Sequence, residues 1–285
     1  MTRPRPSDLG SGRTWRQFFG STFSAVGLAA VPFGLYDVLY PDKAAKIATP
    51  AAVLVVVGAV LYGLFRAWPR VVQTSYASPN TRIVIVPGDL LKNDAHLVIG
   101  MSDTFDTKPG VIAPSSLQAQ FLAELLGGDV ARFDQGIRRS LHAEGVAPTG
   151  TVDKAGKTDR YPLGTVATLR EGRRRFFCVA YSELNEANEA HANVDGVAAS
   201  LSALWKAVCR HANGEPVAMP VIGRGQSRLS QVLSPADAIK LQAMSFWLAS
   251  REERRCEELR IVVQPDVYDS LDRGSLQDFL NGLGK

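Results

Sequence analysis

Two long stretches near the start of the chain are apolar and almost free of charge. Residues 17–39 carry Asp37 as their only charged side chain, and residues 50–67 carry only Arg66. A helix needs about 17–25 mostly apolar residues to cross a bilayer, and both stretches reach that range. The segment between them, residues 40–46, is short and polar, so the pattern predicts an antiparallel pair of transmembrane helices.

Positive charge predicts the orientation of this hairpin. Four arginines precede the first stretch and three lie in or after the second, whereas the loop between them holds only Lys43 and Lys46. Because Lys and Arg concentrate on the cytoplasmic side, we expect a multi-pass protein of the inner (cell) membrane with both termini cytoplasmic. A cleaved signal peptide and a pair of core helices in a soluble protein are the alternatives. The second apolar stretch argues against a signal peptide, and the uninterrupted apolarity of both stretches argues against core helices of a soluble protein.

Beyond residue 80, short β-branched runs alternate with amphipathic helical runs, which is typical of an α/β domain. Strands are expected at residues 82–86, 96–101, 165–169, 175–181, 217–222 and 259–264. Helices are expected from residue 117, over 130–144 and 187–211, after residue 234 and near the C-terminus. The expected organisation is a cytoplasmic segment (1–16), a transmembrane hairpin (17–69), a polar linker (70–80) and a ligand-sensing domain (81–285).

Composition and charge narrow the class of protein. With 46% apolar and 21% charged residues, the chain has the composition of a folded protein. The net charge of +4 is small, and the arginine-rich residues 170–175 indicate a solvated turn, with contact to anionic headgroups as the alternative. No motif supports nucleic-acid binding. Three widely spaced cysteines without a CxxC pair argue against a disulfide framework or a zinc site and fit a reducing compartment.

Two of the expected strands end in small and polar residues that suit a ligand pocket. Pro87, Gly88 and Asp89 follow the apolar run 83–86, and residues 100–103 (Gly-Met-Ser-Asp) follow another such run. In open α/β sheets, ligands bind in the crevice beyond the carboxyl ends of the strands. We therefore expect these two ends to form one wall of a pocket, although simple turns would have the same sequence.

Two further stretches are candidate phosphate sites. Ser115 and Ser116 precede a helical run, and a serine cap leaves backbone N–H groups facing outward. Residues 223–225 form a Gly-Arg-Gly loop after a buried strand, where backbone amides can approach an anion. The loop is neither a Walker nor a Rossmann motif, since Arg228 stands where the latter needs a third glycine. Neither stretch is specific evidence by itself, because an ordinary helix cap or an ordinary turn would have the same sequence.

Residues suited to catalysis are sparse. The four histidines lack metal-ligand spacing, and no Gly-x-Ser-x-Gly or Cys–His nucleophile pattern occurs. Asp103 and Asp106 could form an acid/base pair, but loop carboxylates are more often caps or ligand contacts. We therefore expect a protein that binds a ligand, is not an enzyme, and holds no metal or cofactor.

Taken together, these stretches resemble a macro domain, the α/β module that binds ADP-ribose. Residues 83–90 resemble that family's first strand and Gly-Asp-Ile turn, residues 157–168 its central loop and strand, and residues 219–226 its phosphate loop. With two spans in front, the chain is similar to the membrane-anchored macro effectors of Thoeris antiphage defence. Residues 98–107 and 115–121, with their Asp-Thr-Phe-Asp-Thr and Ser-Leu-Gln motifs, carry this narrower likeness. The implied fold is a macro-like mixed sheet flanked by helices, preceded by a two-helix transmembrane hairpin.

The resemblance also implies a ligand and a binding site. The ligand is an ADP-ribose derivative, expected to be histidine–ADP-ribose, made by a partner TIR-domain enzyme during infection. Adenine is expected at Asp89, the diphosphate at the serine-capped helix and the glycine loop, and the distal group near aspartates that suit a cation. The expected ligand-binding residues are Asp89, Leu90, Ser102, Asp103, Thr104, Phe105, Asp106, Ser115, Ser116, Gln120, Gly223, Arg224, Gly225, Gln226 and Ser227.

The implied function is that of a sensor and effector. Ligand binding is expected to drive homo-oligomerisation, disruption of the lipid bilayer, and arrest or death of the infected cell. The chain departs from hydrolytic macro domains, because residues 100–103 replace their Asn-Ala-Ala-Asn and residues 108–114 replace their glycine-rich first loop. Binding without turnover is therefore expected. The alternatives are a membrane-tethered ADP-ribosyl hydrolase and a static anchor that recruits other proteins.

Overall fold

The computed structural model describes residues 12–39, 41–67, 71–223, 229 and 233–284 of the 285-residue chain. The chain divides into two compact units, Met1–Val71 and Val72–Lys285. The described part of the first unit is helical, and the described part of the second is a mixed α/β domain.

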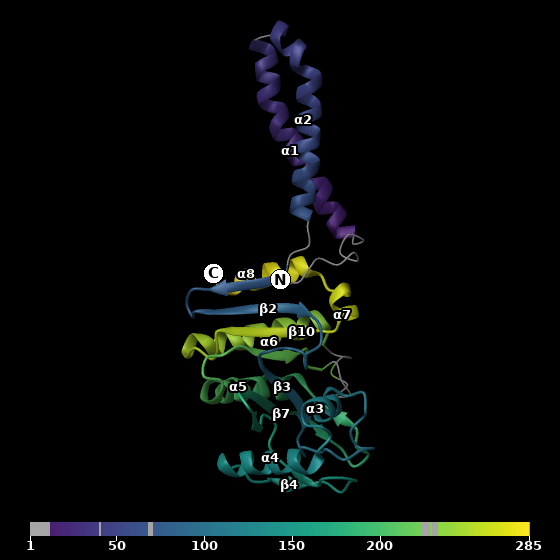
Figure 1. Ribbon diagram of the computed structural model, residues 1–285, viewed down its shortest axis with the longest axis vertical. Coiled ribbons are helices and arrows are strands. Elements are labelled where there is room, and N and C mark those ends of the chain that lie inside the picture. The colour runs from purple at the N-terminus through teal and green to yellow at the C-terminus, as the bar shows by residue number, and fades with distance from the viewer. Residues whose placement is uncertain (1–11, 40, 68–70, 224–228, 230–232, 285) are drawn as a thin grey trace. The chain divides into compact units, whose positions relative to one another are not determined.

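The first unit consists of two helices, α1 (Gly12–Leu39) and α2 (Pro41–Ala67), which run antiparallel and side by side (Figure 1). Of the predicted polar loop, residues 41–46 are thus helical, and residue 40 lies outside the described part of the chain. Proline suits the first turn of a helix, because its φ is already helical and the missing N–H would have no acceptor there. Large apolar side chains point outward, among them Phe23, Leu28 and Leu54, which are 73–79% exposed.

The first helix has the length and apolarity of a membrane-crossing segment. Among the described residues, Phe18–Tyr36 is long and apolar enough to span a bilayer, whereas the apolar helix Thr49–Leu64 is shorter. One of the two predicted spans therefore has the required length in this part of the chain. The two-span topology stays a prediction.

The two helices are in close contact where Gly63 of α2 faces α1. A Cβ atom at Gly63 would lie 2.1 Å from Thr22 Oγ1 and 3.0 Å from the Phe18 ring. Small residues allow such close approach of two helices. The same construction at Gly58, also in α2, meets nothing within 4 Å.

The second unit is built on a mixed sheet in which eight of the described strands take part. Their order is β1-β2-β10-β9-β3-β7-β6, and β8 pairs with β7; Figure 1 shows β2, β10, β3 and β7 in this sequence. The inner strands β2, β10, β9, β3 and β7 run parallel, whereas β1, β6 and β8 pair antiparallel. The strands are β1 (Val72–Tyr76), β2 (Thr81–Pro87), β3 (His96–Ser102), β6 (Val166–Glu171), β7 (Arg174–Leu184), β8 (Ala190–His191), β9 (Val217–Pro220) and β10 (Glu258–Val263).

Helices cover both faces of this sheet, because alternate side chains of its strands are buried on opposite sides. Ile85 of β2 joins the core that includes Trp205 of α5 and residues of α6 and α8. Ile99 of β3 joins the other core, with Phe121 of α3 and residues of α4. The helices are α3 (Leu117–Leu125), α4 (Val130–Ala143), α5 (Val194–His211), α6 (Pro235–Glu252), α7 (Pro265–Ser270) and α8 (Arg273–Leu283). The predicted mixed α/β sheet flanked by helices is confirmed.

The segment predicted as a linker contains the edge strand β1. Val72 and Tyr76 lie on the same face of this strand and are 2% and 6% exposed. The Tyr76 hydroxyl donates to the Leu280 carbonyl oxygen of α8 (2.8 Å), and burial raises its pKa to about 12. Two buried side chains thus dock a stretch whose other residues are polar, which explains why its sequence resembles a linker.

Helix α5 begins later than the predicted residue 187. The Asn193 side chain accepts the N–H of Gly196 (2.6 Å) and caps the helix, so residues 194–211 are helical. The chain before this cap pairs with β7 as β8. The chain between α4 and β6 also holds a small two-stranded sheet of β4 (Gly150–Thr151) and β5 (Asp159–Arg160).

Two cysteines lie in the core of this unit. Cys178 of β7 and Cys256, just before β10, are both 0% exposed. Burial raises the pKa of the Cys256 thiol to about 12 and also raises that of Cys178. The third cysteine, Cys209 of α5, is only half-buried.

The loop between α4 and β6 is fastened by the carboxylate of Asp106. Lys154 Nζ donates to Oδ2 (2.5 Å), as does the N–H of Lys157 (2.8 Å), and the N–H of Lys108 donates to Oδ1 (2.9 Å). Gly156 passes so close that a Cβ atom there would lie 2.1 Å from Oδ2. Burial by itself raises the pKa of Asp106, but the Lys154 and backbone hydrogen bonds outweigh it and the net pKa is lowered.

Substitution at Gly63 tests the contact between α1 and α2. Gly63→Leu should separate the helices near Thr22, at an overpacking cost of about 1–3 kcal/mol. Gly58→Leu is the matched control and should leave the helix pair unchanged, because that position is open. Distances between spin labels on exposed positions of the two helices measure the effect. Equal distances in the two variants would show that the crossing is not at Gly63.

The Asp106 clamp should make stability depend on acid pH. Its folded pKa lies below the unfolded value of 3.8, so its contribution is complete above that pH and is lost as pH falls through the folded pKa. Asp106→Asn should cost about 3 kcal/mol at pH 7, and less as the pH falls below 4. Unfolding in urea from pH 3 to 7 measures this. Asp103→Asn should show the opposite slope, since burial raises the Asp103 pKa; parallel profiles would contradict the assignment.

Candidate functional site

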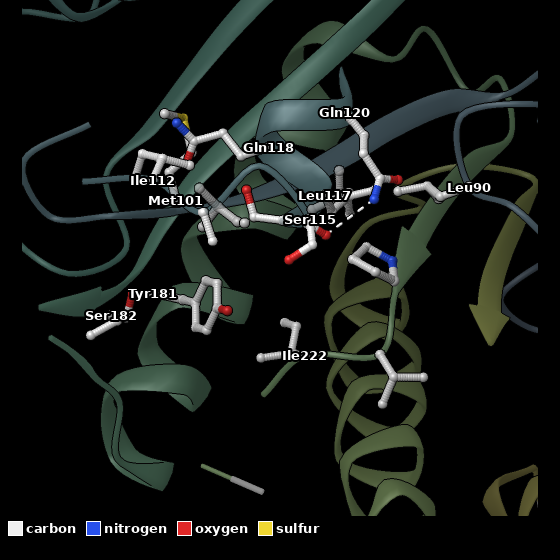
Figure 2. Close-up of a pocket in the computed structure, with 18 of the residues that line it drawn as sticks. Leu90, Met101, Ile112, Ser115, Leu117, Gln118, Gln120, Tyr181, Ser182 and Ile222 are labelled. Carbon is white, nitrogen blue, oxygen red and sulfur yellow. Dashed lines mark hydrogen bonds between the residues drawn. The ribbon is translucent and has the colours of Figure 1, made fainter. Parts of the chain in front are cut away.

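The carboxyl ends of the five parallel strands meet at one edge of the sheet, where they surround a cavity of about 570 Å³. This edge is where open α/β sheets bind ligands, and the volume is in the usual range of small-molecule sites. Figure 2 shows side chains from several of these elements converging on the cavity. The lining includes residues 88–90, 98, 100–102, 111–113, 115–118, 120, 179, 181, 182, 184, 190, 220–222, 262–264 and 267.

Asp89 stands at the rim of the cavity just beyond β2. The N–H of Gly88 donates to the Val263 carbonyl oxygen (2.9 Å), which ties this turn to β10. Asp89 Oδ1 accepts the N–H of Leu91 (3.0 Å), and Oδ2 lies 3.5 Å from Lys92 Nζ. The side chain remains 41% exposed, so the carboxylate can accept a hydrogen bond from a ligand.

The amino end of α3 forms a second wall. Ser116 is the N-cap, and its Oγ accepts the N–H of Ala119 (3.1 Å). Gln120 bends back so that Nε2 donates to the Ser115 carbonyl oxygen (3.1 Å), the bond drawn in Figure 2. The first N–H groups of a helix have no acceptor within it and favour an anion. Since Ser115, Ser116 and Leu117 all line the cavity, this helix end offers an anion site.

The turn after β9 closes the cavity on another side. Val221 and Ile222 line it, and Gly223 follows with φ +84°, where a Cβ atom would lie 2.7 Å from Leu229. The side chain of Gln242 holds this turn, because it donates to the Pro220 carbonyl oxygen (2.8 Å) and accepts the Ile222 N–H (3.3 Å). The remaining residues of the predicted phosphate loop lie outside the described part of the chain: Arg224, Gly225, Gln226 and Ser227.

The structure keeps most of the predicted ligand-binding residues 102–106 away from the cavity. Ser102 lines it, but Asp103, Thr104, Phe105 and Asp106 do not, and these four are 0–2% exposed. The Asp106 carboxylate is occupied by the clamp described above. These residues therefore fasten loops behind the cavity wall.

Asp103 is engaged in the same way. Its Oδ1 accepts the N–H of Leu184 (3.0 Å), its Oδ2 pairs with Arg160 Nη1 (2.8 Å), and its carbonyl oxygen accepts the Tyr161 N–H (2.9 Å). Burial raises the Asp103 pKa, which the Leu184 amide and the Arg160 guanidinium partly offset. The carboxylate thus joins the loop before β6 to the end of β7.

Several lining residues did not appear in the sequence prediction. Tyr181, Ser182 and Leu184 come from the end of β7, and residues 262–264 come from the end of β10. Both strands were expected, so their carboxyl ends were a signal for further lining positions. The loop 111–113 also contributes, and its apolar sequence gave no such signal.

Comparison with known proteins identifies relatives of this fold. A family model described as the macro domain of the Thoeris protein ThsA matches residues 83–264. No curated protein matches the chain. Among solved structures, a mutant of the Oceanobacillus iheyensis macrodomain is similar with TM-score 0.47 and 12% identity, over 74% of this chain and 96% of that one. The Oceanobacillus iheyensis macrodomain with ADP gives TM-score 0.46 and 12% identity, over 75% and 98%.

The family match covers more than half of the chain and nearly the whole site. Every residue in the cavity lining except Val267 lies between residues 83 and 264. The chain therefore belongs to the macro-domain family of the Thoeris protein ThsA, a family whose fold binds ADP-ribose derivatives.

Proposed function

We propose that this protein is a membrane-anchored antiphage effector that senses an ADP-ribose-derived signal in the cavity at the strand ends. The signal is histidine–ADP-ribose made by a TIR-domain enzyme. Its binding leads to self-association of the chain and disruption of the inner membrane, so that the infected cell stops growing or dies.

The observation that carries this proposal is the convergence of three predicted ligand elements on one cavity. Asp89, the capped start of α3 and the turn after β9 are far apart in the sequence, yet all reach the same lining. A carboxylate suits the exocyclic amine of adenine, and the amino end of a helix suits a diphosphate. An adenine nucleotide with a further group is therefore the class of ligand that these groups fit.

The chemistry of the lining supports binding without turnover. Asp89 is the one carboxylate among its described residues, and that set holds no His, Cys, Lys or Arg. General acid–base catalysis needs a proton donor or acceptor within hydrogen-bond reach of the bond that breaks. Asp89 belongs to the adenine end in this arrangement, far from the glycosidic bond to the distal group, so we propose a sensor rather than an enzyme.

The membrane step rests on the α1–α2 hairpin. Its large apolar side chains are exposed on several faces, which suits a lipid environment or contact with further copies of the hairpin. We propose that both helices cross the inner membrane with the termini in the cytoplasm, where the signal is made. A ligand shifts a conformational equilibrium only through its different affinity for the two states. The ligand-bound state in this proposal is the one that oligomerises.

Removal of the Asp89 carboxylate should weaken ligand binding. The loss of a charge-assisted hydrogen bond predicts that Asp89→Ala binds ADP-ribose about 10- to 100-fold more weakly, as calorimetry with the full chain in detergent measures. Asp94→Ala is the matched control, because Asp94 is 91% exposed, pairs with Arg260 (2.9 Å) and does not line the cavity. The same affinity in both variants would contradict the adenine assignment.

Turnover and toxicity separate the sensor from its alternatives. The unaltered chain should release no ADP-ribose from an ADP-ribosylated protein, and cells that make both the chain and the signal should lose membrane potential. Cells with the Asp89→Ala chain should keep it. Release of ADP-ribose that disappears in Asp89→Ala would establish a hydrolase instead.

A further inference from the structure

Tyr181 lines the cavity at the carboxyl end of β7. In the parallel pairing with β3, Met101 is opposite Ala180 and Ser102 is opposite Ser182, so Tyr181 is the extra residue on β7 at this point. The Tyr181 ring lies on the same face of β7 as Phe177 and Val179, as strict alternation requires, and it packs against the core that includes them.

Gly100 of β3 provides the space that the Tyr181 ring occupies. A Cβ atom at Gly100 would lie 2.4 Å from Cε1 of Tyr181 and 3.1 Å from Cδ1. Gly100 does not have a positive φ, so the backbone does not need glycine there. The absence of a side chain at this position therefore leaves room for the Tyr181 ring. Gly100 thus makes room for an aromatic surface at this part of the lining.

Tyr181 and Asp89 lie at opposite ends of the cavity. Strands β10, β9 and β3 separate β2 from β7, and four inter-strand spacings of about 4.8 Å place the two strand ends ~19 Å apart. Figure 2 shows the Tyr181 ring projecting into the cavity on the side away from Leu90, the neighbour of Asp89. A ligand whose adenine lies at Asp89 therefore extends its other end toward Tyr181.

Among the described residues that line the cavity, the others at this end carry no charge. They are Ser102, Ser182, Leu184 and Ala190, while Asp103 and Asp106 lie behind the wall. Discrimination between distal groups at this end thus depends on shape and on the aromatic surface rather than on ion pairing. Aromatic pairs prefer offset-stacked or edge-to-face contact, and a group without a ring gains no such contact.

Resting on the proposed function, we propose that Tyr181 is the residue that selects the distal group of the signal. Its ring makes an aromatic contact with a planar, π-bearing group attached to the ADP-ribose. Gly100 acts as a positioning residue, because it keeps the ring in place. An imidazole belongs to this class of group.

The test compares how tightly the full chain binds histidine–ADP-ribose, which carries an imidazole, and ADP-ribose, which lacks it. The ratio of these two affinities should fall roughly two- to tenfold in Tyr181→Leu, the range that one aromatic contact contributes. Tyr181→Phe is the matched control, because it keeps the ring, and its ratio should equal that of the unaltered chain. Gly100→Ala should lower the ratio as Tyr181→Leu does, since the added methyl group displaces the ring.

Each outcome bears on one claim. Because both affinities are measured on the same variant, a general loss of folded protein cancels in the ratio. An unchanged ratio in Tyr181→Leu, or an equal fall in Tyr181→Phe, overturns the role of Tyr181 and leaves the sensor function standing. Failure of the unaltered chain to bind either ligand overturns the proposed function itself.

Discussion

The parallel hydrogen-bond ladder that joins β2, β10, β9, β3 and β7 is the constraint on which the site depends. Parallel strands held in this register end at the same edge, so each delivers its following turn to one place. Helices on both faces bury the strands and leave only this edge and its opposite open to solvent-facing loops. The cavity is thus a result of topology, and its chemistry is set by the few residues that follow each strand.

Acidic residues near this edge divide into two roles. Asp89 lies at the rim with its side chain partly open to solvent, whereas Asp103 and Asp106 are buried and accept hydrogen bonds from backbone and basic groups. Because Asp103 and Asp106 do not line the cavity, its described surface consists largely of backbone, hydroxyl and apolar groups. The loops that Asp103 and Asp106 hold lie behind the residues that line the cavity.

Much of the fold could be predicted from local sequence patterns. The parts that could not be predicted are those that depend on partners far away in the sequence. The uninterrupted apolar runs of β2 and β3 and the cap at Ser116 have signatures that sequence alone reveals, and the structure has them. The edge strand β1 was not predicted, since only two of its residues are buried against the rest of the domain. Asp106 gave no sign of its role because Lys154 is 48 residues away. Tyr181 was missed because the space for its ring comes from Gly100, which is adjacent only once the two strands are paired.

The two buried cysteines have a consequence for how the folded domain meets oxidants. The thiolate is the form that reacts with oxidants, and the raised pKa values of Cys178 and Cys256 keep both sulfurs protonated at neutral pH. Neither sulfur is accessible to peroxide or to glutathione in the folded domain. Oxidants in solution therefore do not reach these two sulfurs while the domain is folded. Of the three cysteines, Cys209 on α5 is the one that is partly exposed.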